Sequence, residues 1–434
     1  MKKKLVIGLG QTGLSILTFL HQHQQPAIGF DTRSTLTNLD SLRQYGPCYL
    51  EYFPETLWPE IEEVIVSPGV NLDHPVLQQA RTRQLPIIGD IELFYRQARA
   101  PIIAITGTNA KSTVTTLVTA MLQACGKTAL MGGNIGIPAL ELLDHPQPDY
   151  YVLELSSFQL NLVQTFQATV GVILNISPDH LDRHHTMQAY QRAKERIYLH
   201  CPHPIINRAM QNLPKLKVAS SFGLSTPTQA HAWGILEDHL ALGTTKVLPK
   251  TALSPGLSGD HNLENALSAL AILAPLNLPL TPQLQVLQTF KGLPHRCVLV
   301  KTIDQASWYN DSKGTNVGAT LAAMQGIAAH IPGKIILLLG GVGKDQDFKP
   351  LREAINAHAR SVLVYGQDRA KILADLQDLP CIAVNTPFPE MLAQAKQQTH
   401  PGDAVLFSPA CASFDMFRDY IDRGEQFTAW VEGC

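Results

Sequence analysis

Short apolar runs alternate with helix-like amphipathic stretches along nearly the whole chain. This alternation predicts parallel β-sheets with helical crossovers, which is an α/β fold. A glycine turn and a helix separate the first two runs, as expected for strands that pair in parallel. The predicted strands are Leu5–Ile7, Ala27–Asp31, Val64–Ser67, Ile102–Thr106, Tyr151–Leu155, Val170–Asn175, Ser307–Asn310, Lys334–Gly340, Ser361–Gly366 and Asp403–Ser408.

The strand pattern divides the chain into three blocks, which we predict as domains of residues 1–90, 91–291 and 292–434. A length of 434 residues is too great for one core of ordinary size, which agrees with this division. Within the second block, Val218–Leu248 has strand-like pieces and turn residues but no helical pattern, so we expect a small β excursion there. An apolar helix is predicted at Leu263–Leu273.

Composition narrows the class of protein. Hydrophobic residues make up 45% of the chain and the net charge is −2, which indicates a folded globular protein. The balanced charge argues against partners such as nucleic acid or a membrane surface. No apolar run reaches the roughly 18 residues of a spanning helix, and early glycines interrupt any signal-peptide pattern. The 7 cysteines form no CxxC pair, which indicates reduced thiols in a cytoplasmic protein.

The segment Thr106–Thr113 (TGTNAKST) gives the strongest local signal. A buried strand ends in a loop of small residues, and Lys-Ser-Thr then opens a helix. In such a loop the backbone N–H groups and the helix N-terminus face phosphate oxygens. Lys111 would neutralise the β- and γ-phosphates, and Ser112 or Thr113 would give a hydroxyl to Mg²⁺. This pattern predicts ATP binding.

The loop departs from the full GxxxxGK[ST] pattern, because Ile105 and Ala110 replace its two glycines. An ordinary strand-to-helix turn is therefore the alternative interpretation. A β-carbon excludes most conformations with positive φ, so we expect Ala110 to have a negative φ.

A second glycine turn, Gly8–Gly13, follows the first predicted strand and matches GxGxxG, with Asp31 ending the next strand. Alone, this pattern indicates dinucleotide binding, as in a nicotinamide dehydrogenase. Any diphosphate can use the same turn, however, and a dehydrogenase would leave the loop Thr106–Thr113 unexplained. We therefore favour a nucleotide substrate at the first turn and ATP at the second.

Four further side chains bear on the question of metal chemistry. Glu154 stands at the carboxyl end of a predicted strand, where it could hold Mg²⁺ or simply face solvent. His180 and His184 have the spacing of a zinc-binding helix face, but Pro178 predicts a turn and no glutamate follows His180. By spacing alone, Lys194 is a solvated helical lysine.

Ten ordered motifs make the chain resemble the Mur ligases of bacterial cell-wall synthesis, and among them the D-glutamate-adding members. The resemblance covers essentially all 434 residues. The motifs are Thr106–Thr113 (TGTNAKST), Gly132–Gly136 (GGNIG), Tyr151–Leu160 (YVLELSSFQL), Asn175–Asp182 (NISPDHLD), Ala193–Tyr198 (AKERIY), Gly259–Ala266 (GDHNLENA), Gly292–Arg296 (GLPHR), Asn310–Asn316 (NDSKGTN), Leu339–Asp345 (LGGVGKD) and Ser408–Phe414 (SPACASF).

The resemblance implies three domains: a Rossmann-like domain for a UDP-sugar, a central P-loop-type ATPase domain and a Rossmann-like C-terminal domain for an amino acid. It implies ATP-dependent ligation of D-glutamate to UDP-N-acetylmuramoyl-L-alanine through an acyl phosphate, by a cytoplasmic monomer using two Mg²⁺ ions. Alternatives are another amino-acid ligase of the superfamily, including folylpolyglutamate synthases, and a nucleotide-binding regulator without ligase activity.

The resemblance also implies which residues act. The catalytic ones would be Lys111, Glu154, His180, Lys194 and Arg296. ATP would contact Gly107, Thr108, Asn109, Ala110, Lys111, Ser112, Thr113, Asn265, Arg296, Asp311 and Lys313. The UDP-sugar would contact Gln11, Thr12, Asp31, Thr32, Arg33, Ser67, Pro68, Gly69 and Asn134. The amino acid would contact His180, Thr315, Lys344, Ser413 and Phe414. The Mg²⁺ ligands would be Ser112, Thr113, Glu154, His180 and Lys194 as its carbamate.

Individual roles follow from the same resemblance. Carbamylation of Lys194 by CO₂ would make it an anionic oxygen ligand, and Asn265 would meet the adenine. Asn262 shares a helix face with Asn265, with helix capping as its alternative role. Lys344 would hold the distal carboxylate of D-glutamate; the alternative is an ordinary loop lysine. Phe414 would contact the amino acid; the alternative is an aromatic residue of the core. Because several of these residues come from the third block, we expect catalysis to require domain closure.

Overall fold

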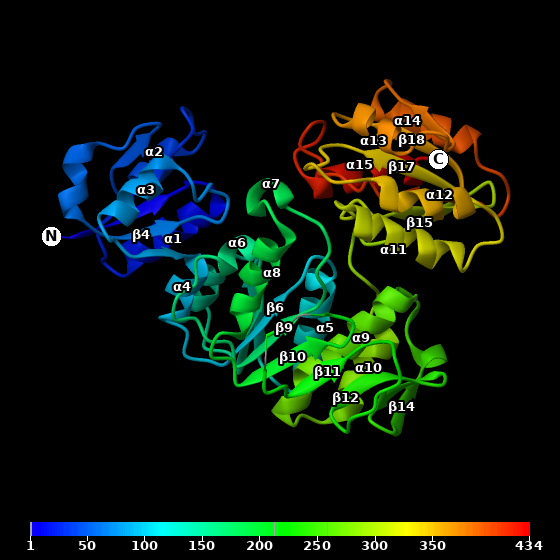
Figure 1. The fold of residues 1–434 in the computed structure, drawn as a ribbon, viewed down its shortest axis with the longest axis horizontal. Coiled ribbons are helices and arrows are strands. Elements are labelled where there is room, and N and C mark those ends of the chain that lie inside the picture. The colour runs from blue at the N-terminus through cyan, green and yellow to red at the C-terminus, as the bar shows by residue number, and fades with distance from the viewer. Residues whose placement is uncertain (1, 212, 215, 258) are drawn as a thin grey trace. The chain divides into compact units, whose positions relative to one another are not determined.

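The computed structural model describes residues 2–211, 213–214, 216–257 and 259–434. Its elements form three mainly parallel sheets with helical crossovers, which confirms the predicted α/β class (Figure 1). The chain divides into two compact units. One contains residues 1–175, 188–248 and 267–286, and the other contains residues 176–187, 249–266 and 287–434.

The first sheet has five strands in the order β3-β2-β1-β4-β5, and every pair of neighbours is parallel. Its centre is apolar because Leu5, Ile7, Val64 and Val66 are buried against helix residues such as Leu77. Three strands agree with the predicted runs, whereas the short edge strands β3 and β5 were not predicted. The elements are β1 (Lys3–Ile7), α1 (Gln11–Gln22), β2 (Ala27–Asp31), α2 (Leu39–Arg43), β3 (Cys48–Leu50), β4 (Ile61–Val66), α3 (Pro75–Thr82), β5 (Ile87–Gly89) and α4 (Asp90–Tyr95).

The second sheet has nine strands in the order β14-β13-β12-β11-β10-β9-β6-β8-β7. Strand β6 takes the bounds predicted for it, and it lies between β8 and β9, parallel to both. The carboxyl ends of these strands therefore meet at one edge of the sheet. The elements of this part are β6 (Ile102–Thr106), α5 (Lys111–Ala124), β7 (Ala129–Gly133), η2 (Ala139–Asp144), β8 (Tyr150–Glu154), α6 (Ser157–Leu160), β9 (Val170–Ile173), α7 (Leu181–His184), α8 (Met187–Glu195), η3 (Arg196–Tyr198) and β10 (His203–Asn207).

The β excursion predicted for Val218–Leu248 is confirmed. Strands β11 (Ser220–Phe222), β12 (Ala232–Leu236), β13 (His239–Leu242) and β14 (Thr245–Pro249) extend the second sheet, and β12 and β13 pair antiparallel. Helix α9 (Asp260–Leu273) begins earlier than predicted, so Asn262 lies within its first turn and the capping alternative is wrong. Asn265 donates a hydrogen bond to Asn262 over 3.1 Å, which confirms that the two share a face. Helix α10 (Leu280–Thr289) follows.

The third sheet has six strands in the order β15-β16-β20-β17-β18-β19. Side chains of β17 alternate between two cores: Leu337 and Leu339 face one, and Ile336 and Leu338 face the other. The first core includes residues of α11, α12 and α13, and the second includes residues of α14 and α15. Helices thus cover both faces (Figure 1). The elements are β15 (Val298–Ile303), β16 (Ala306–Asn310), α11 (Val317–Ala328), β17 (Ile335–Gly340), α12 (Arg352–His358), β18 (Ala359–Tyr365), α13 (Arg369–Asp375), β19 (Cys381–Ala383), α14 (Phe388–Gln397), β20 (Ala404–Phe407) and α15 (Tyr420–Glu432).

Strand β15 is the main departure from the predicted third block, since it was not predicted and it pairs antiparallel with β16. Ile303 is buried, whereas Val298 and Val300 are only partly covered and Leu299 is exposed.

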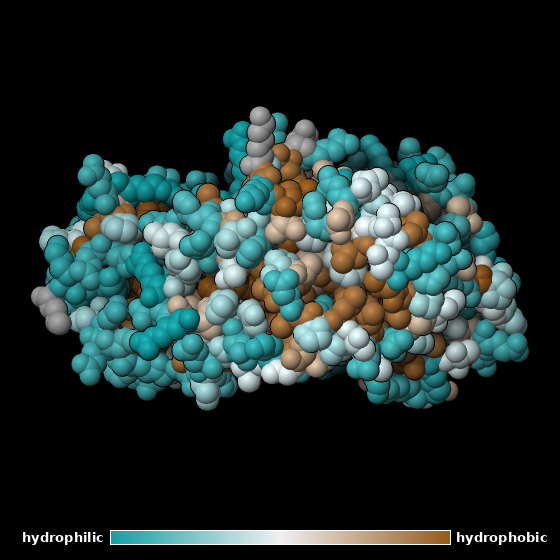
Figure 2. Space-filling view, turned by 90° about the horizontal axis from the view of Figure 1, so that it is seen from below, coloured by the Kyte–Doolittle hydropathy of each residue, from teal (hydrophilic) through white to brown (hydrophobic). Residues whose placement is uncertain are grey.

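The surface is of mixed polarity. Hydrophilic side chains predominate on the face drawn in Figure 2, and hydrophobic side chains gather to the right of its centre. Exposed apolar atoms are normal on a folded protein. Among the described residues, every helix is too short or too polar to cross a membrane.

Candidate active site

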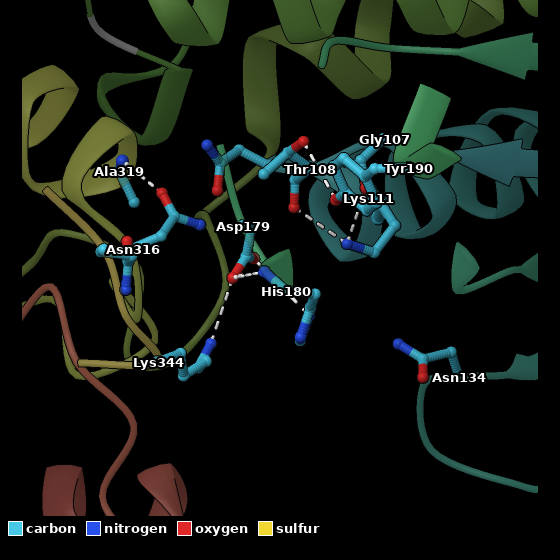
Figure 3. Close-up of polar contacts among 12 residues, drawn as sticks. Gly107, Thr108, Lys111, Asn134, Asp179, His180, Tyr190, Asn316, Ala319 and Lys344 are labelled. Atoms are coloured by element: carbon cyan, nitrogen blue, oxygen red, sulfur yellow. Dashed lines mark hydrogen bonds and ion pairs between the residues drawn. The ribbon is translucent and has the colours of Figure 1, made fainter. Parts of the chain in front are cut away.

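Hydrogen bonds within the loop between β6 and α5, and from this loop to Asn175, hold the loop in place. Asn175 accepts from the N–H of Asn109 over 2.8 Å through its side chain, and its backbone carbonyl accepts from the N–H of Thr108 over 3.0 Å. The Lys111 ammonium donates to the carbonyls of Gly107 and Thr108 over 3.0 and 2.9 Å (Figure 3). The lysine therefore already lies over the loop, where phosphates would be met by backbone N–H groups. Ser112 and Thr113 are buried in the first turn of α5.

Ala110 contradicts the expected negative φ. It stands directly before α5 with a φ of 67°, in the left-handed region that glycine adopts without strain. For an alanine this conformation costs about 1 kcal/mol, since its β-carbon crowds the backbone. The loop thus keeps the glycine geometry without the glycine, and local strain is retained at this position.

Glu154 is a candidate cation ligand at the end of a central strand of the second sheet. It is the last residue of β8, it is 2% exposed, and its Oε1 accepts a hydrogen bond from the Asn134 amide over 2.8 Å. Its Oε2 is buried and has no hydrogen-bond partner in the described structure. An unpaired buried carboxylate oxygen beside a phosphate-binding type of loop suits a hard cation such as Mg²⁺, which prefers oxygen ligands.

Lys194 is not the solvated lysine that its spacing alone indicated. It lies on α8, it is 1% exposed, and its ammonium donates to the carbonyl of Gly107 over 2.9 Å. It also lies over the ring of Tyr190, whose hydroxyl is 3.2 Å from that of Thr108. Lys111 and Lys194 thus share one acceptor, the Gly107 carbonyl. No motif of the sequence pointed to Tyr190, which only tertiary packing brings to this loop.

The first glycine turn is held by Asp31. This buried carboxylate accepts from the N–H of Leu9 over 2.6 Å and pairs with the Arg33 guanidinium through both oxygens, over 2.9 and 2.8 Å. These hydrogen bonds hold the pKa of Asp31 below its ordinary value despite the opposing effect of burial. Gly13 is required here, because a β-carbon would stand 2.0 Å from the carbonyl oxygen of Gly8. Asp31, which was predicted to contact the UDP-sugar, therefore holds the glycine turn and the Arg33 side chain in place.

A groove of about 390 Å³ opens beside this turn. Gln11 and Arg33 line it, as does the segment Thr35–Asn38, which sequence reasoning missed. Of the other residues predicted for the UDP-sugar, Thr12 lies on α1 and Thr32 is exposed after β2. Ser67 donates to the Gly8 carbonyl over 2.6 Å, and Pro68 and Gly69 follow it at the end of β4.

On the third sheet, Asp311 and Lys313 follow β16 as predicted, but the Asp311 side chain points into the interior. It accepts from Ser408 over 2.7 Å and from the N–H of Cys297 over 3.1 Å. Burial raises its pKa to about 7. The Lys313 ammonium lies 3.6 Å from the ring centre of Tyr420. Asp311 therefore links Cys297, directly before β15, to Ser408, directly after β20.

Of the residues predicted for the amino acid, His180 lies directly before α7, and the other four lie in loops after β16, β17 and β20. Lys344 pairs with Asp179 over 3.3 Å, and Asp179 also accepts from the N–H of His180 over 3.0 Å (Figure 3). Thr315 is partly buried and Ser413 is buried. Phe414 is 74% exposed, so its alternative role as a core aromatic is wrong.

Two buried residues that sequence reasoning missed join these loops. Gln346 donates to the carbonyls of Gly343 and Ala410 and accepts from the N–H of Val317. Arg423 is fully buried, donates to Ser312 through two nitrogens, and reaches the Cys411 carbonyl over 3.1 Å.

Comparison with known proteins agrees with this architecture. Residues 2–89 match the N-terminal domain of the MurD-like Mur ligases, residues 105–273 match the Mur ligase middle domain, and residues 295–411 match the Mur ligase glutamate ligase domain. The boundaries predicted near 90 and 292 stay predictions.

Relatives resemble the chain over its whole length. UDP-N-acetylmuramoylalanine–D-glutamate ligase of Legionella pneumophila (strain Paris) is 43% identical over 443 aligned residues, covering 99% of this chain and 98% of the relative. The enzyme of the same name from Acinetobacter baylyi is 42% identical, with coverage of 99% and 98%.

Among solved structures, UDP-N-acetylmuramate-alanine ligase MurC from Thermotoga maritima matches with a TM-score of 0.63 at 18% identity and covers 100% of both chains. MurF from Acinetobacter baumannii matches with a TM-score of 0.64 at 18% identity, covering 94% of this chain and 91% of that one. These two likenesses concern the fold, whereas the relatives define the family. The chain belongs to the Mur ligase family.

Proposed function

We propose that this protein is an ATP-dependent ligase that joins D-glutamate to UDP-N-acetylmuramoyl-L-alanine in peptidoglycan precursor synthesis. The observation that carries this proposal is the 43% identity over 99% of the chain to ligases named for that reaction. The composition of the nucleotide loop and the buried carboxylate of Glu154 support the ATP-dependent part.

The chemistry begins with a carboxylate, which is a poor electrophile. Transfer of the terminal phosphoryl group of ATP gives an acyl phosphate, which the amine of D-glutamate then attacks with loss of phosphate. Phosphoryl transfer depends mainly on positioning and on neutralisation of charge. Lys111 and the backbone N–H groups of residues 107–113 would hold the phosphates, and Arg296 would meet the transferring group. Asn265, Asp311 and Lys313 would bind the nucleoside and phosphates.

Mg²⁺ at this site would neutralise phosphate oxygens. Ser112, Thr113 and Glu154 would hold one ion, and His180 with carbamylated Lys194 would hold the second. Carbamylation is supported by the sharing of the Gly107 carbonyl between Lys111 and Lys194. Two ammonium groups on one acceptor repel each other, and conversion of Lys194 to an anion would remove this repulsion.

For the other substrates, Gln11, Thr12 and Arg33 would bind the UDP-sugar, with Asp31 and Ser67 supporting the turn. Thr315, Lys344, Ser413 and Phe414 would bind the amino acid. ATP and UDP-sugars are cytoplasmic nucleotides, so we place the protein in the cytoplasm, as a monomer whose product serves cell-wall growth and division.

The decisive experiment measures phosphate release with ATP, Mg²⁺ and UDP-N-acetylmuramoyl-L-alanine across a panel of D- and L-amino acids. We expect release with D-glutamate and negligible release with L-glutamate or meso-diaminopimelate. Preference for another amino acid would favour a different ligase of the superfamily.

The Lys194→Ala variant tests the carbamate. We expect it to lose nearly all activity, because the anionic ligand is absent, and to regain part of it when a short-chain carboxylate is added. Full activity in the variant would contradict the proposed role, and Lys127→Ala provides a control on a half-exposed lysine of the same unit.

A further inference from the structure

Asn175 continues the pairing of β6 with β9 beyond the ends of both strands. Thr106 and Ile173 are the last residues paired within the strands. The Leu174 N–H then donates to the Thr106 carbonyl over 2.8 Å, and the Thr108 N–H donates to the Asn175 carbonyl over 3.0 Å. The loop between β6 and α5 is therefore attached to the carboxyl end of β9 by backbone hydrogen bonds like those that join the strands.

The next contact is made by the Asn175 side chain in place of a backbone. Its Oδ1 accepts from the Asn109 N–H over 2.8 Å, and its Nδ2 donates to the Asn109 carbonyl over 3.2 Å. A side-chain amide combines a carbonyl acceptor with an NH₂ donor, so it can bond both backbone polar groups of one residue. Asn175 thus fixes the backbone of Asn109, which is the residue directly before Ala110.

Ala110 is the residue of this loop that needs such a constraint. Its φ of 67° and ψ of −5° lie in the left-handed region, which costs alanine more than glycine. A strained conformation persists only where the surrounding structure holds it. Helix α5 begins directly after Ala110, and the residue directly before it is held by Asn175, so the strained residue is fixed from both sides.

We propose that Asn175 is a positioning residue that compensates for the missing glycine at position 110 and so keeps the loop in the conformation that binds the ATP phosphates. This inference rests on the proposed function. Asn175 acts through the backbone of Asn109 and requires no contact with the nucleotide. Without it, Ala110 would spend part of its time at negative φ, which would displace residues 107–109 relative to the start of α5. The apparent dissociation constant rises as the fraction of molecules in the binding conformation falls.

The test measures the dissociation constant of Mg²⁺–ADP by titration calorimetry on the 434-residue chain, which requires neither the UDP-sugar nor D-glutamate. Four proteins form a cycle: the wild type, Asn175→Ala, Ala110→Gly and the double variant. Thr169→Ala is the matched control, because Thr169 links the amino ends of the same two strands by accepting from the Ile102 N–H over 3.3 Å. Thermal unfolding would establish that each variant is folded.

We expect Asn175→Ala to raise the dissociation constant about 10-fold or more, because two hydrogen bonds to the loop are lost. The double variant should recover about 5-fold of this loss, because glycine adopts the left-handed conformation at a lower cost. Ala110→Gly alone should stay within about 3-fold of the wild type, since Asn175 already fixes the loop there. Thr169→Ala should also stay within about 3-fold.

Two results would overturn the inference. An unchanged dissociation constant in Asn175→Ala would mean that the loop keeps its conformation without the amide. An equal weakening by Asn175→Ala in the presence and absence of Ala110→Gly would mean that Asn175 does not act through the conformation of Ala110.

If Asn175→Ala does not fold, Ala110→Gly alone decides. An affinity within about 3-fold of the wild type supports the inference, whereas a gain of about 5-fold from glycine alone would show that the wild-type loop is not held, which would overturn it. Absence of Mg²⁺–ADP binding by the wild type would instead refute the ATP-dependent part of the proposed function.

Discussion

The Glu154→Gln substitution separates the catalytic role of this carboxylate from its effect on stability. Glu154 is 2% exposed, and only one of its two oxygens has a hydrogen-bond partner in the described structure, the Asn134 amide. A buried acceptor without a partner costs about 1–3 kcal/mol, and more when it is charged. Glutamine has the same shape, and its oxygen can accept the hydrogen bond from Asn134.

We therefore expect E154Q to be more stable than the wild type in EDTA, by about 1–2 kcal/mol after allowing for the unpaired amide that glutamine introduces. With Mg²⁺ and ATP present, the wild type should instead be more stable than E154Q. A ligand at 100 times its Kd stabilises the folded state by about 2.7 kcal/mol, and the variant should lose most of this gain. Phosphate release should fall by at least about 100-fold, because the charge that holds the cation is absent.

The assay is thermal unfolding with EDTA and with Mg²⁺ and ATP, in parallel with phosphate release. Glu141→Gln is the control, since Glu141 is an exposed carboxylate on η2 and should change stability by no more than about 0.5 kcal/mol. A decrease in the stability of E154Q in EDTA would refute the reasoning, because it would mean that Oε2 has a stabilising partner.

Two other substitutions test backbone strain and buried charge. Ala110→Gly should raise the free energy of unfolding by about 0.5–1 kcal/mol in urea, because glycine removes the strain of the left-handed conformation at a smaller entropic cost. The control is Ala124→Gly, at an exposed position of helix α5, which should lower the free energy of unfolding. Equal effects of the two substitutions would contradict the proposed strain at Ala110. Asp90 is fully buried and accepts from Gln159 over 3.0 Å, and burial raises its pKa from 3.8 to about 6. Because the folded pKa lies above the unfolded value, ionisation costs the folded state nothing below pH 4 and up to about 3 kcal/mol above pH 6. Asp90→Asn should thus match the wild type near pH 4 and exceed its stability by about 1–3 kcal/mol at pH 8, and a pH-independent difference would contradict this.

The sequence by itself determined most of the central strands and the composition of the nucleotide loop. Apolar runs such as Ile102–Thr106 can be buried on both faces only within a parallel sheet, so their positions followed from hydrophobicity alone. The Lys-Ser-Thr run after that strand indicated phosphate binding for the same local reason, since one strand, one loop and one helix terminus make the whole feature. Edge strands such as β3, β5 and β15 were missed because they are short or only partly buried.

Only the tertiary structure decided what each functional side chain contacts. By its spacing alone, Lys194 was interpreted as a solvated helical lysine, but the fold buries it against Gly107. Asp31 was predicted to contact the UDP-sugar, but its oxygens accept hydrogen bonds from Leu9 and Arg33. The pairing of Asp179 with Lys344 spans 165 positions. Such contacts depend on how separate strands order themselves in a sheet, and local hydrophobic periodicity carries no information about that order.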